Sequence, residues 1–390
     1  MNDGSKDQSV NKLKQVFDLV EVPKFFEDSL YTQPIKAIYR SKSYPSIILL
    51  DKEHGKKSDA LNAGINACTT HYFFGIDSDT LIDDHSFEAC IRSILNSPET
   101  IAIGATISVN NDCLLQSNRI CTRNFPQTFI TAVQSLEYLR SFFIRQGWDC
   151  WGGNLIIAGA FCVFPKDLII QAGGFIPSSG EDMEMTIRLH RIMKKRKIPY
   201  KIFYLPDPIA WTKVPSKWAS LAKQRARWHT GLLESLFFHK SICFNPSYGL
   251  IAFFSYPFWL AGEALQPIME IFGLLIILLS IALGVFNIYF FLVFIGMTFV
   301  FTFVFTLSCI LIESLSFQRY PSSKTVLYLL FYALIENFGY RQLCLWWKIR
   351  GFGRFLKTFA LVKKQSFFIK KMIRQSGLTN RQPRTQQAQS

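Results

Sequence analysis

The run Tyr72-Phe73-Phe74-Gly75-Ile76 leads directly into Asp77-Ser78-Asp79. Its uncharged, mostly aromatic residues predict a buried strand, with the aspartates at the point where that strand opens into a loop. The flanking segments alternate in type, with strands expected at 46–50 and 101–109 and helices at 59–67 and 87–95. This alternation predicts an α/β domain with a mostly parallel sheet, whose ligands bind at the carboxyl ends of its strands.

Asp77 and Asp79 stand two residues apart at the expected strand end. Two carboxylates in this arrangement can share a hard divalent cation, Mg²⁺ or Mn²⁺, and leave coordination sites open for phosphate oxygens. The cation would neutralise a diphosphate leaving group. An Asp-x-Asp triplet is also common in solvated turns, so its position after a buried strand is what favours the metal site.

A second acidic pair, Glu181-Asp182, follows Gly180 and precedes a helical stretch at 185–191. Acidic residues favour a helix N-terminus through capping and the helix dipole, which is the structural explanation of the pair. The functional explanation is a general base that takes the proton of an acceptor hydroxyl. The two are compatible, since a cap position fixes a carboxylate at the rim of a cleft.

The segment Gln224-Arg225-Ala226-Arg227-Trp228 combines an amide, guanidinium groups and an indole on one expected helix. Gln224, Arg227 and Trp228 share a face because they stand at i, i+3 and i+4. Arginine can grip a diphosphate with two hydrogen bonds, and tryptophan offers a sugar ring a flat apolar surface. A basic amphipathic helix on a membrane surface is the alternative interpretation.

Hydrophobic residues make up 49% of the 390 residues and are unevenly distributed. The segment 271–312 contains no Asp, Glu, Lys or Arg, so it is long enough to cross a membrane about twice at roughly 20 residues per crossing. The shorter apolar segments 249–262 and 325–347 could be further crossings, buried core helices or helices lying flat at the interface. We therefore expect four crossings, with two as the alternative, in a multi-pass protein of the cell's inner (plasma) membrane.

Positive charge exceeds negative charge by 15, with 43 Lys and Arg against 28 Asp and Glu. Basic residues cluster after Trp347, as expected for the cytoplasmic side of a membrane, and this places the catalytic domain in the cytoplasm. We expect membrane lipids and sugar-nucleotide phosphates, and no nucleic acid, as the partners of this charge. Nine scattered Cys without a CxxC pair agree with a reducing compartment.

These patterns divide the chain into three expected parts. Residues 1–244 form the cytoplasmic catalytic domain, residues 245–347 the transmembrane helices, and residues 348–390 a basic cytoplasmic tail that is disordered at its end.

The order of the motifs resembles that of the processive family 2 glycosyltransferases, which include cellulose, chitin, hyaluronan and poly-N-acetylglucosamine synthases. The resemblance extends from residue 2 to about residue 364. The motifs that carry it are Asn2-Asp3-Gly4-Ser5, Lys57-Ser58-Asp59-Ala60-Leu61-Asn62, Asp77-Ser78-Asp79, Gly173-Gly174-Phe175, Glu181-Asp182, Trp211-Thr212-Lys213-Val214-Pro215 and Gln224-x-x-Arg227-Trp228. The resemblance implies a GT-A-type domain followed by a helical transmembrane region. It also implies an inverting transfer of a sugar, with N-acetylglucosamine favoured, from a UDP-sugar to a growing β-linked polysaccharide.

The resemblance also implies a role for each matching residue. Asp3 would contact the uracil and Lys57 the nucleotide, while Asp79 would hold Mg²⁺ or Mn²⁺ with the diphosphate and Asp77 would face the nucleotide and sugar. Asp182 would be the catalytic base, beside Glu181. Gln224, Arg227 and Trp228 would line the diphosphate and the acceptor end, and Gly159-Ala160-Phe161 resembles the acceptor-side segment of the family.

The chain departs from the family pattern in two places. Lys213 stands where the family has Glu, and the sequence starts at the Asp-Gly-Ser motif, so the first two strands of the family's domain are missing. We expect an incomplete GT-A-type domain that by itself binds UDP poorly and is weakly active or inactive, with the missing half encoded upstream or supplied by a separate polypeptide. An accessory export subunit would be another partner.

Two alternatives to a polysaccharide synthase remain open. The first is a non-processive transferase that adds one sugar to a glycolipid or a short acceptor. The second is an inactive truncated membrane fragment that serves as an assembly partner.

Overall fold

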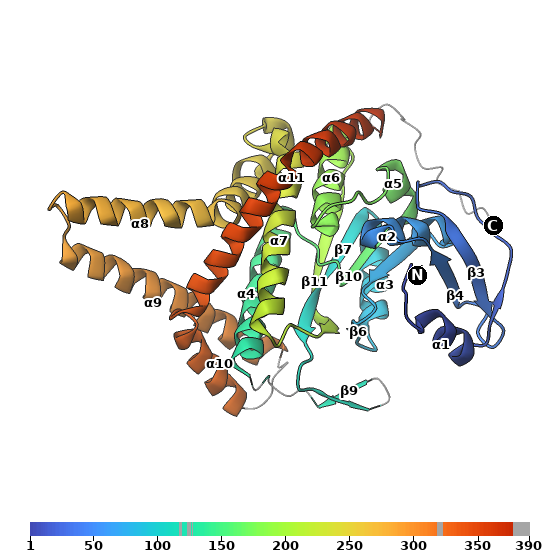
Figure 1. Cartoon of the computed structure of the whole chain (residues 1–390), viewed down its shortest axis with the longest axis horizontal. Coiled ribbons are helices and arrows are strands. Elements are labelled where there is room, and N and C mark those ends of the chain that lie inside the picture. Colours follow the sequence, from blue (N-terminus) through green and yellow to red (C-terminus); the bar gives the residue numbers. More distant parts are fainter. Residues whose placement is uncertain (117–118, 123–125, 127, 318–322, 377–390) are drawn as a thin grey trace.

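The computed structural model describes residues 1–116, 119–122, 126, 128–317 and 323–376. It shows an α/β domain built on two larger sheets, followed by a set of C-terminal helices (Figure 1). The first sheet has the order β1 (Asn2–Asp3), β4 (Ile48–Lys52), β3 (Ile35–Ser41) and β2 (Leu19–Glu21). The second has the order β5 (Tyr72–Ile76), β10 (Phe161–Pro165), β7 (Thr100–Val109), β11 (Lys201–Thr212) and β6 (Leu81–Ile82). A separate ribbon pairs β8 (Leu114–Gln116) with β9 (Arg119–Thr122).

The prediction of a mostly parallel sheet was wrong, because both sheets are mixed. Within the described residues only β1–β4 and β7–β11 pair in parallel. Strand β10 runs antiparallel to both of its neighbours, with Cys162 opposite Gly75 of β5 and Gly104 of β7. Alternating strands and helices in a sequence predict which elements form, but the direction in which β10 enters the sheet depends on how the chain returns to it.

The expected strand at 72–76 is confirmed as β5, and the other expected elements appear with shifted ends. The described helices of the α/β part are α1 (Ser9–Val16), α2 (Lys56–Ala67), α3 (Ser86–Asn96), α4 (Phe129–Cys150), α5 (Lys166–Gln171), α6 (Glu181–Arg196) and α7 (Trp218–Phe238). The core lies around β7, which is buried along its whole length. Apolar side chains of β10 contribute to it on both faces, with Phe161 in one cluster and Phe164 in the other.

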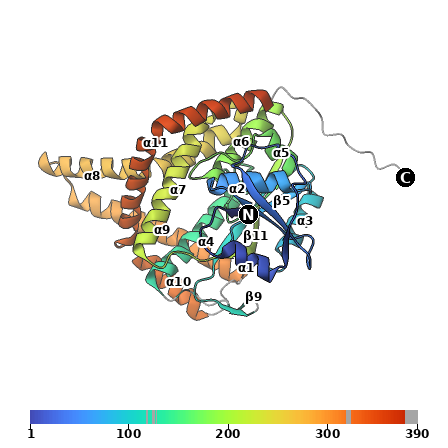
Figure 2. The same cartoon turned by 45° about the vertical axis from the view of Figure 1, so that its right-hand side comes forward.

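Helix α11 (Tyr340–Ser376) runs along α7 in both Figure 1 and Figure 2. The hydroxyl of Thr230 on α7 donates to the carbonyl oxygen of Gly351 at 3.0 Å. A Cβ on Gly351 would lie 2.7 Å from the carbonyl oxygen of Ala226, so only glycine permits this close contact of the two helices. Buried Trp347 and Phe355 anchor α11 on either side of this crossing.

The expected boundary at residue 348 is therefore not a break in the structure. The basic segment from 348 to 376 continues α11 and lies in part against the catalytic domain, because its apolar side chains are buried there. Residues 377–390, for which we expected disorder, lie outside the described residues.

The apolar segment forms a helical hairpin that projects from the domain (Figure 1). Its arms are α8 (Gln266–Ala282) and α9 (Ile288–Ile312), and the break between them contains Gly284 and Asn287, as the sequence predicts. Short helical turns precede and follow this hairpin: Lys240–Ile242, Pro246–Tyr248, Ile251–Ser255, Phe258–Ala264 and Glu313–Phe317, before α10 (Ser323–Ile335).

Among the described residues one helix, Ile288–Phe317, is long and apolar enough to cross a membrane. A second crossing would result if Ile251–Ala264 and Gln266–Ala282, which meet at a bend of 56°, count together as one span. The number of crossings therefore stays a prediction.

A buried ion pair connects the apolar helices to the catalytic domain. Arg140 of α4 donates to both carboxylate oxygens of Glu336, at 2.7 and 2.9 Å. Glu336 is fully buried between α10 and α11, and Arg341 donates to the same carboxylate at 3.1 Å. Because an unpaired buried charge is costly, this contact holds α4 and the C-terminal helices in one arrangement.

Candidate active site

The ends of β5, α2 and α6 meet around the ammonium group of Lys57. Its Nζ lies 2.6 Å from Oδ1 of Asp77 and 3.6 Å from Oε1 of Glu181. The same group donates to the carbonyl oxygen of Gly159 at 3.1 Å. Lys57 thus joins the acidic residue after β5 to the acidic pair at the start of α6.

The charges in this cluster shift one another's protonation. Burial alone would lower the pKa of Lys57, but the nearby carboxylates of Asp77, Glu181 and Asp182 outweigh burial and raise it. Burial and the neighbouring charge of Asp182 raise the pKa of Glu181, while Lys57 and Arg227 act in the opposite direction. A charged lysine beside a carboxyl group with a raised pKa marks this cluster as a candidate functional site.

Asp182 is fixed by backbone donors on two sides. Its Oδ2 accepts from the backbone N–H of Gly159 at 2.6 Å, and its Oδ1 accepts from that of Met183 at 2.8 Å. Each carboxylate oxygen keeps a further lone pair that can accept a proton. Asp182 therefore lies in the first turn of α6, as the sequence predicts, and also contacts the backbone just before β10.

Helix α7 holds the loop that leads into α6. Glu234 accepts from the hydroxyl of Ser178 at 3.0 Å and from the backbone N–H of Ser179 at 2.8 Å. A Cβ on Gly231 would lie 2.7 Å from the backbone nitrogen of Gly180, so the two backbones are in direct contact. These contacts set the position of the N-terminus of α6, and with it the position of Asp182.

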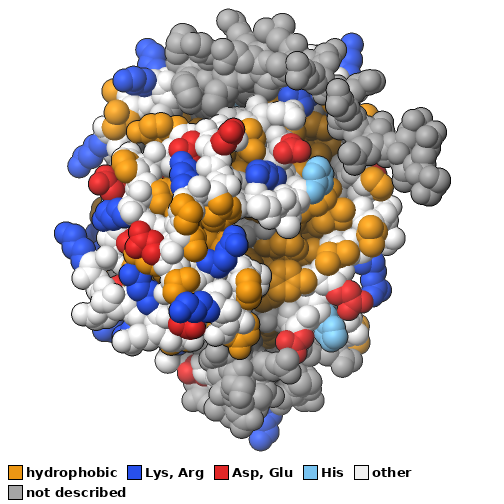
Figure 3. All heavy atoms as spheres, turned by 90° about the vertical axis from the view of Figure 1, so that its right-hand side faces the viewer, with side chains coloured by type: hydrophobic (Ala, Val, Ile, Leu, Met, Phe, Trp, Pro, Cys, Tyr) orange, Lys and Arg blue, Asp and Glu red, His pale blue; other side chains and the backbone are white. Residues whose placement is uncertain are grey.

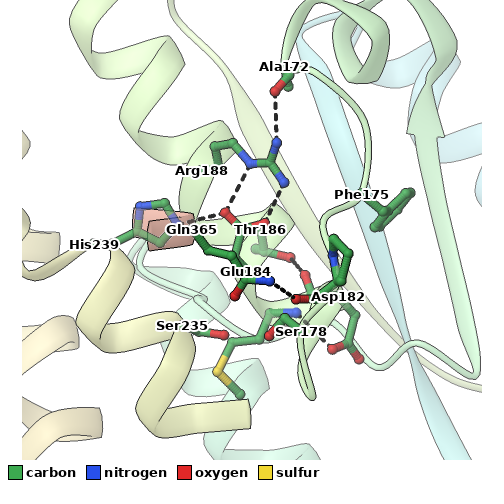
Figure 4. Close-up of polar contacts among 12 residues, drawn as sticks. Ala172, Phe175, Ser178, Asp182, Glu184, Thr186, Arg188, Ser235, His239 and Gln365 are labelled. Atoms are coloured by element: carbon green, nitrogen blue, oxygen red, sulfur yellow. Dashed lines mark hydrogen bonds and ion pairs between the residues drawn. The ribbon is translucent and has the colours of Figure 1, made fainter. Parts of the chain in front are cut away.

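Behind this loop a buried polar network fixes the rest of α6 (Figure 4). Glu184 pairs with Arg188, whose Nη1 donates to the carbonyl oxygen of Ala172 at 2.8 Å. His239, at the end of α7, lies with its Nε2 3.0 Å from Oε1 of Glu184, and its Nδ1 lies 2.9 Å from Arg191. An arginine can only donate, so Nδ1 of His239 accepts, and the neutral ring satisfies both of its partners.

Because this region contains two buried histidines, we expect the protein to lose stability in acid. Burial lowers the pKa of His190 and of His239 from 6.5 to about 4. A depressed histidine pKa stabilises the fold above pH 6.5, and this contribution is lost as the pH falls from 6.5 towards 4. The loss should reach up to about 3 kcal/mol for each ring. Urea unfolding of the chain in detergent between pH 7 and 4.5 measures it.

Replacing His190 by Gln should flatten that pH dependence by about one proton. The matched control is His71→Gln, because the side chain of His71 is 68% exposed. Equal slopes for both variants and the wild type would contradict the assignment of the depressed pKa to the buried ring.

Asp3 lies beside the first turn of α2, the helix that carries Lys57. Its carboxylate accepts from Nζ of buried Lys52 at 2.8 Å and from the backbone N–H groups of Gly55 and Lys56 at 2.9 and 2.8 Å. Burial would raise the pKa of Asp3, but these donors outweigh it and hold the pKa below its usual value. In this structure Asp3 stabilises the entry to α2.

The described residues contain no group of three or more His, Cys, Asp or Glu side chains that could hold a metal ion. Asp79 is exposed two residues beyond Asp77. Mg²⁺ is commonly held by one or two carboxylates, with substrate phosphates and waters as the other ligands. The pair of oxygen donors therefore fits a divalent cation that is bound together with a diphosphate.

The helix α7 presents Gln224 and Arg227 at a pocket of about 440 Å³ that is also lined by Lys223 and by Arg354 of α11. Trp228 is 38% exposed, and its ring lies 4.7 Å from the guanidinium carbon of Arg225. Of the three residues expected to share a helix face, Gln224 and Arg227 both line the pocket, and Trp228 is not among its lining residues.

Sequence reasoning missed three residues that shape this region. Glu137 of α4 pairs with Arg225 and accepts from the hydroxyl of Tyr340 at 2.9 Å. It therefore connects the part of α7 that carries Trp228 to α4 and α11. Glu234 could have been found, because it follows Arg227 by seven residues and so lies on nearly the same helix face. Glu137 and Arg354 carry no such signal, since their partners are far away in the sequence.

On the face shown in Figure 3, hydrophobic side chains line a hollow among scattered charged groups. This face includes the side of the molecule on which the first sheet lies in Figure 1. Strand β1, which ends in Asp3, and strand β5, which precedes Asp77, each lie at the end of their own sheet.

Comparison with known proteins gives a family model, curated relatives and solved structures that match this chain. The model of a family described as "Glycosyl transferase family group 2" matches residues 72–335. The poly-beta-1,6-N-acetyl-D-glucosamine synthase of Staphylococcus aureus (strain COL) is 26% identical over 202 residues, which cover 51% of this chain and 44% of that protein. The protein of the same name from Staphylococcus epidermidis has the same identity and coverage. The chain thus matches less than half the length of these curated relatives.

Among solved structures, a mannosyltransferase from Pyrobaculum calidifontis in complex with GDP-Man and Mn²⁺ overlaps with 78% of this chain and 68% of its own. Its sequence identity is 15% and its TM-score is 0.39.

Proposed function

Because this chain belongs to glycosyl transferase family group 2, we propose that it transfers a sugar from a UDP-sugar to a growing β-linked polysaccharide at a membrane. N-acetylglucosamine is the favoured sugar, since relatives with 26% identity are named as synthases of poly-β-1,6-N-acetyl-D-glucosamine. The observation that carries the proposal is the cluster in which Lys57 joins Asp77 to the acidic pair at the start of α6.

In this mechanism Asp182 takes the proton of the acceptor hydroxyl. The backbone donors on Gly159 and Met183 hold its carboxylate in place and keep it ready to accept. General base catalysis by a positioned carboxylate contributes about 10²- to 10⁴-fold to a rate. Removal of the proton makes the acceptor oxygen a nucleophile, which displaces UDP in one step and so inverts the configuration of the sugar carbon.

Lys57, Gln224 and Arg227 bind the donor in this proposal. Lys57 places a positive charge between Asp77 and Glu181, where a phosphate oxygen can replace one of its carboxylate partners. Arg227 can hold a diphosphate by two parallel hydrogen bonds. Trp228, partly exposed beside this face, would pack on a sugar ring of the acceptor, and Asp3 would border the uracil.

Asp77 and Asp79 would hold Mg²⁺ or Mn²⁺, whose positive charge would stabilise the departing diphosphate. Asp79→Ala should therefore weaken UDP binding about tenfold or more in the presence of Mn²⁺. Calorimetric titration with UDP measures this, with EDTA as the internal control, because the variant and the wild type should bind alike once the metal is removed. An unchanged affinity in Mn²⁺ would remove Asp79 from the metal site.

We also propose that the α8–α9 hairpin lies in the membrane and that the catalytic domain faces the cytoplasm. The hairpin exposes large apolar side chains along its length, such as Leu278 at 62% and Phe301 at 77%. An apolar surface of this size is unstable in water and stable in hydrocarbon. The GT-A-type domain and the helical membrane region predicted from the sequence agree with this proposal.

Radiolabelled UDP-N-acetylglucosamine and Mn²⁺ test the proposal when they are incubated with the purified chain and, in parallel, with membranes of the cells that make it, where any separate polypeptide that it needs is present. Polymer that grows with time and is digested by a β-specific hexosaminidase supports it. Single-sugar addition to a lipid or short acceptor would instead favour the non-processive transferase. A chain that neither binds UDP nor transfers a sugar from any UDP-sugar would overturn the proposal. Such a result would leave an assembly role for the chain.

A further inference from the structure

We infer that Arg354 of α11 is a binding residue for the diphosphate of the donor, so that the C-terminal helix completes the nucleotide site. This inference rests on the proposed function and adds to it a residue from a helix outside the motifs. The argument starts from the pocket at which Arg354 meets Lys223, Gln224 and Arg227.

The chemistry of this pocket selects an anion. Three of its four lining residues are cations, the fourth is an amide, and the lining includes no carboxylate. The cations come from two helices, because Lys223 and Arg227 lie on α7 and Arg354 lies on α11. Three positive charges around a pocket of about 440 Å³ repel one another unless a group with several negative charges lies between them.

The arrangement is held firmly enough to form a site. Gly351, one turn before Arg354, contacts the backbone of Ala226, the residue directly before Arg227. Phe355, the residue after Arg354, is buried in the main core cluster. Because this helix crossing fixes both backbones, the exposed side chains of Arg227 and Arg354 start from fixed positions beside the same pocket.

The pocket also lies close to the acidic cluster. Arg227 is near enough to Glu181 for its charge to favour the ionised carboxylate. Gly231, one helical turn after Arg227, is in backbone contact with Gly180 at the start of α6. A diphosphate in the pocket would therefore have its sugar side directed towards the region of Asp182.

Gln224 supplies an independent sign of a ligand. Its Oε1 is buried and has no hydrogen-bond partner within the described part of the chain. Buried polar atoms are nearly always paired, and Gln224 is one of the lining residues of the cationic pocket, so the missing donor can arrive with the ligand. A hydroxyl group of the nucleotide-sugar would satisfy it.

A lipid headgroup phosphate carries the same chemistry as a nucleotide diphosphate. Proximity to the acidic cluster favours the nucleotide, because a headgroup does not need a neighbouring carboxylate pair. The two sources can be separated by experiment, since UDP, uridine and lipid vesicles are distinct probes.

The test compares Arg354→Gln with Arg350→Gln in the full chain. Arg350 lies one turn away on the same helix, where its guanidinium group packs over the ring of Trp346 at 5.7 Å, and it is not among the pocket residues. Arg354→Gln should weaken UDP binding in Mn²⁺ about tenfold. It should leave uridine binding unchanged, because uridine has no phosphate, and Arg350→Gln should bind UDP within about twofold of the wild type.

Three results would overturn the inference. The first is wild-type UDP affinity in Arg354→Gln while the wild type makes product, which would leave the proposed function intact. The second is reduced binding of Arg354→Gln to phosphatidylglycerol vesicles with unchanged UDP affinity, which would assign the pocket to a headgroup. The third is a wild-type chain that binds no UDP at all, which would overturn the proposed function as well.

Discussion

Asp182→Asn should lower the rate of sugar transfer by about a thousandfold, because asparagine keeps the size of the side chain but cannot take the proton of the acceptor. Its UDP affinity should stay within about twofold of the wild type, since the carboxylate contacts backbone groups and not the expected diphosphate site. Initial rates with radiolabelled UDP-sugar and calorimetric titration with UDP give the two quantities.

The matched control for this variant is Asp167→Asn. Asp167 also lies in the first turn of a helix, α5, but its side chain is 70% exposed. This variant should retain wild-type transfer. Because the amide group introduced by Asp182→Asn would face a backbone N–H group, thermal unfolding should be recorded for both variants to separate lost chemistry from lost structure. Near-normal turnover of a folded Asp182→Asn variant would show that the base lies elsewhere.

Gly231→Ala should damage both the stability and the activity of the protein. The added Cβ would lie 2.7 Å from the backbone of Ser179 and Gly180, and no side-chain movement can relieve a contact between backbones. The N-terminus of α6 must then shift, and Asp182 shifts with it. A displacement of about 1 Å at a catalytic group can cost about a hundredfold in rate. We expect a loss of that size and a lower melting temperature.

Gly147→Ala provides the same chemical change without the contact. Gly147 lies inside α4, and a Cβ there would have nothing within 4 Å. Alanine is the better helix former by about 1 kcal/mol, so this variant should be as stable as the wild type or more stable, and fully active. Equal behaviour of the two glycine variants would show that the contact between α7 and the loop before α6 does not position the base.

Local sequence pattern was enough to predict the elements that carry the acidic groups. The aromatic run before Asp77 forms β5, and the acidic pair opens α6, because a buried strand and a helix N-terminus depend on residues close together in the sequence. The placement of Gln224 and Arg227 on one helix face also follows from spacing alone. The role of Asp3 came from the resemblance alone, the roles of Asp79 and Asp182 came from local pattern and the resemblance together, and all three stay predictions.

Residues that act through distant partners could not be predicted in this way. Glu137 reaches Arg225 from a position 88 residues earlier in the chain, and nothing in its own neighbourhood indicates that pairing. The antiparallel course of β10 and the helical continuation past residue 348 were missed for the same reason. Both features depend on packing between segments that are far apart in the sequence, which a local sequence pattern does not reveal.

The sequence by itself determined the family, the acidic and basic groups of the candidate site, and the apolar segment that contains α9. Each of these can be recognised from residues that are consecutive or closely spaced in the sequence. Only the tertiary structure decided that Lys57 joins Asp77 to Glu181 and that Arg354 meets Arg227 at one pocket. The physical reason is that such contacts require the chain to fold back on itself. Glycine at 351 and at 231 then allows helix and loop backbones to come close enough to hold them.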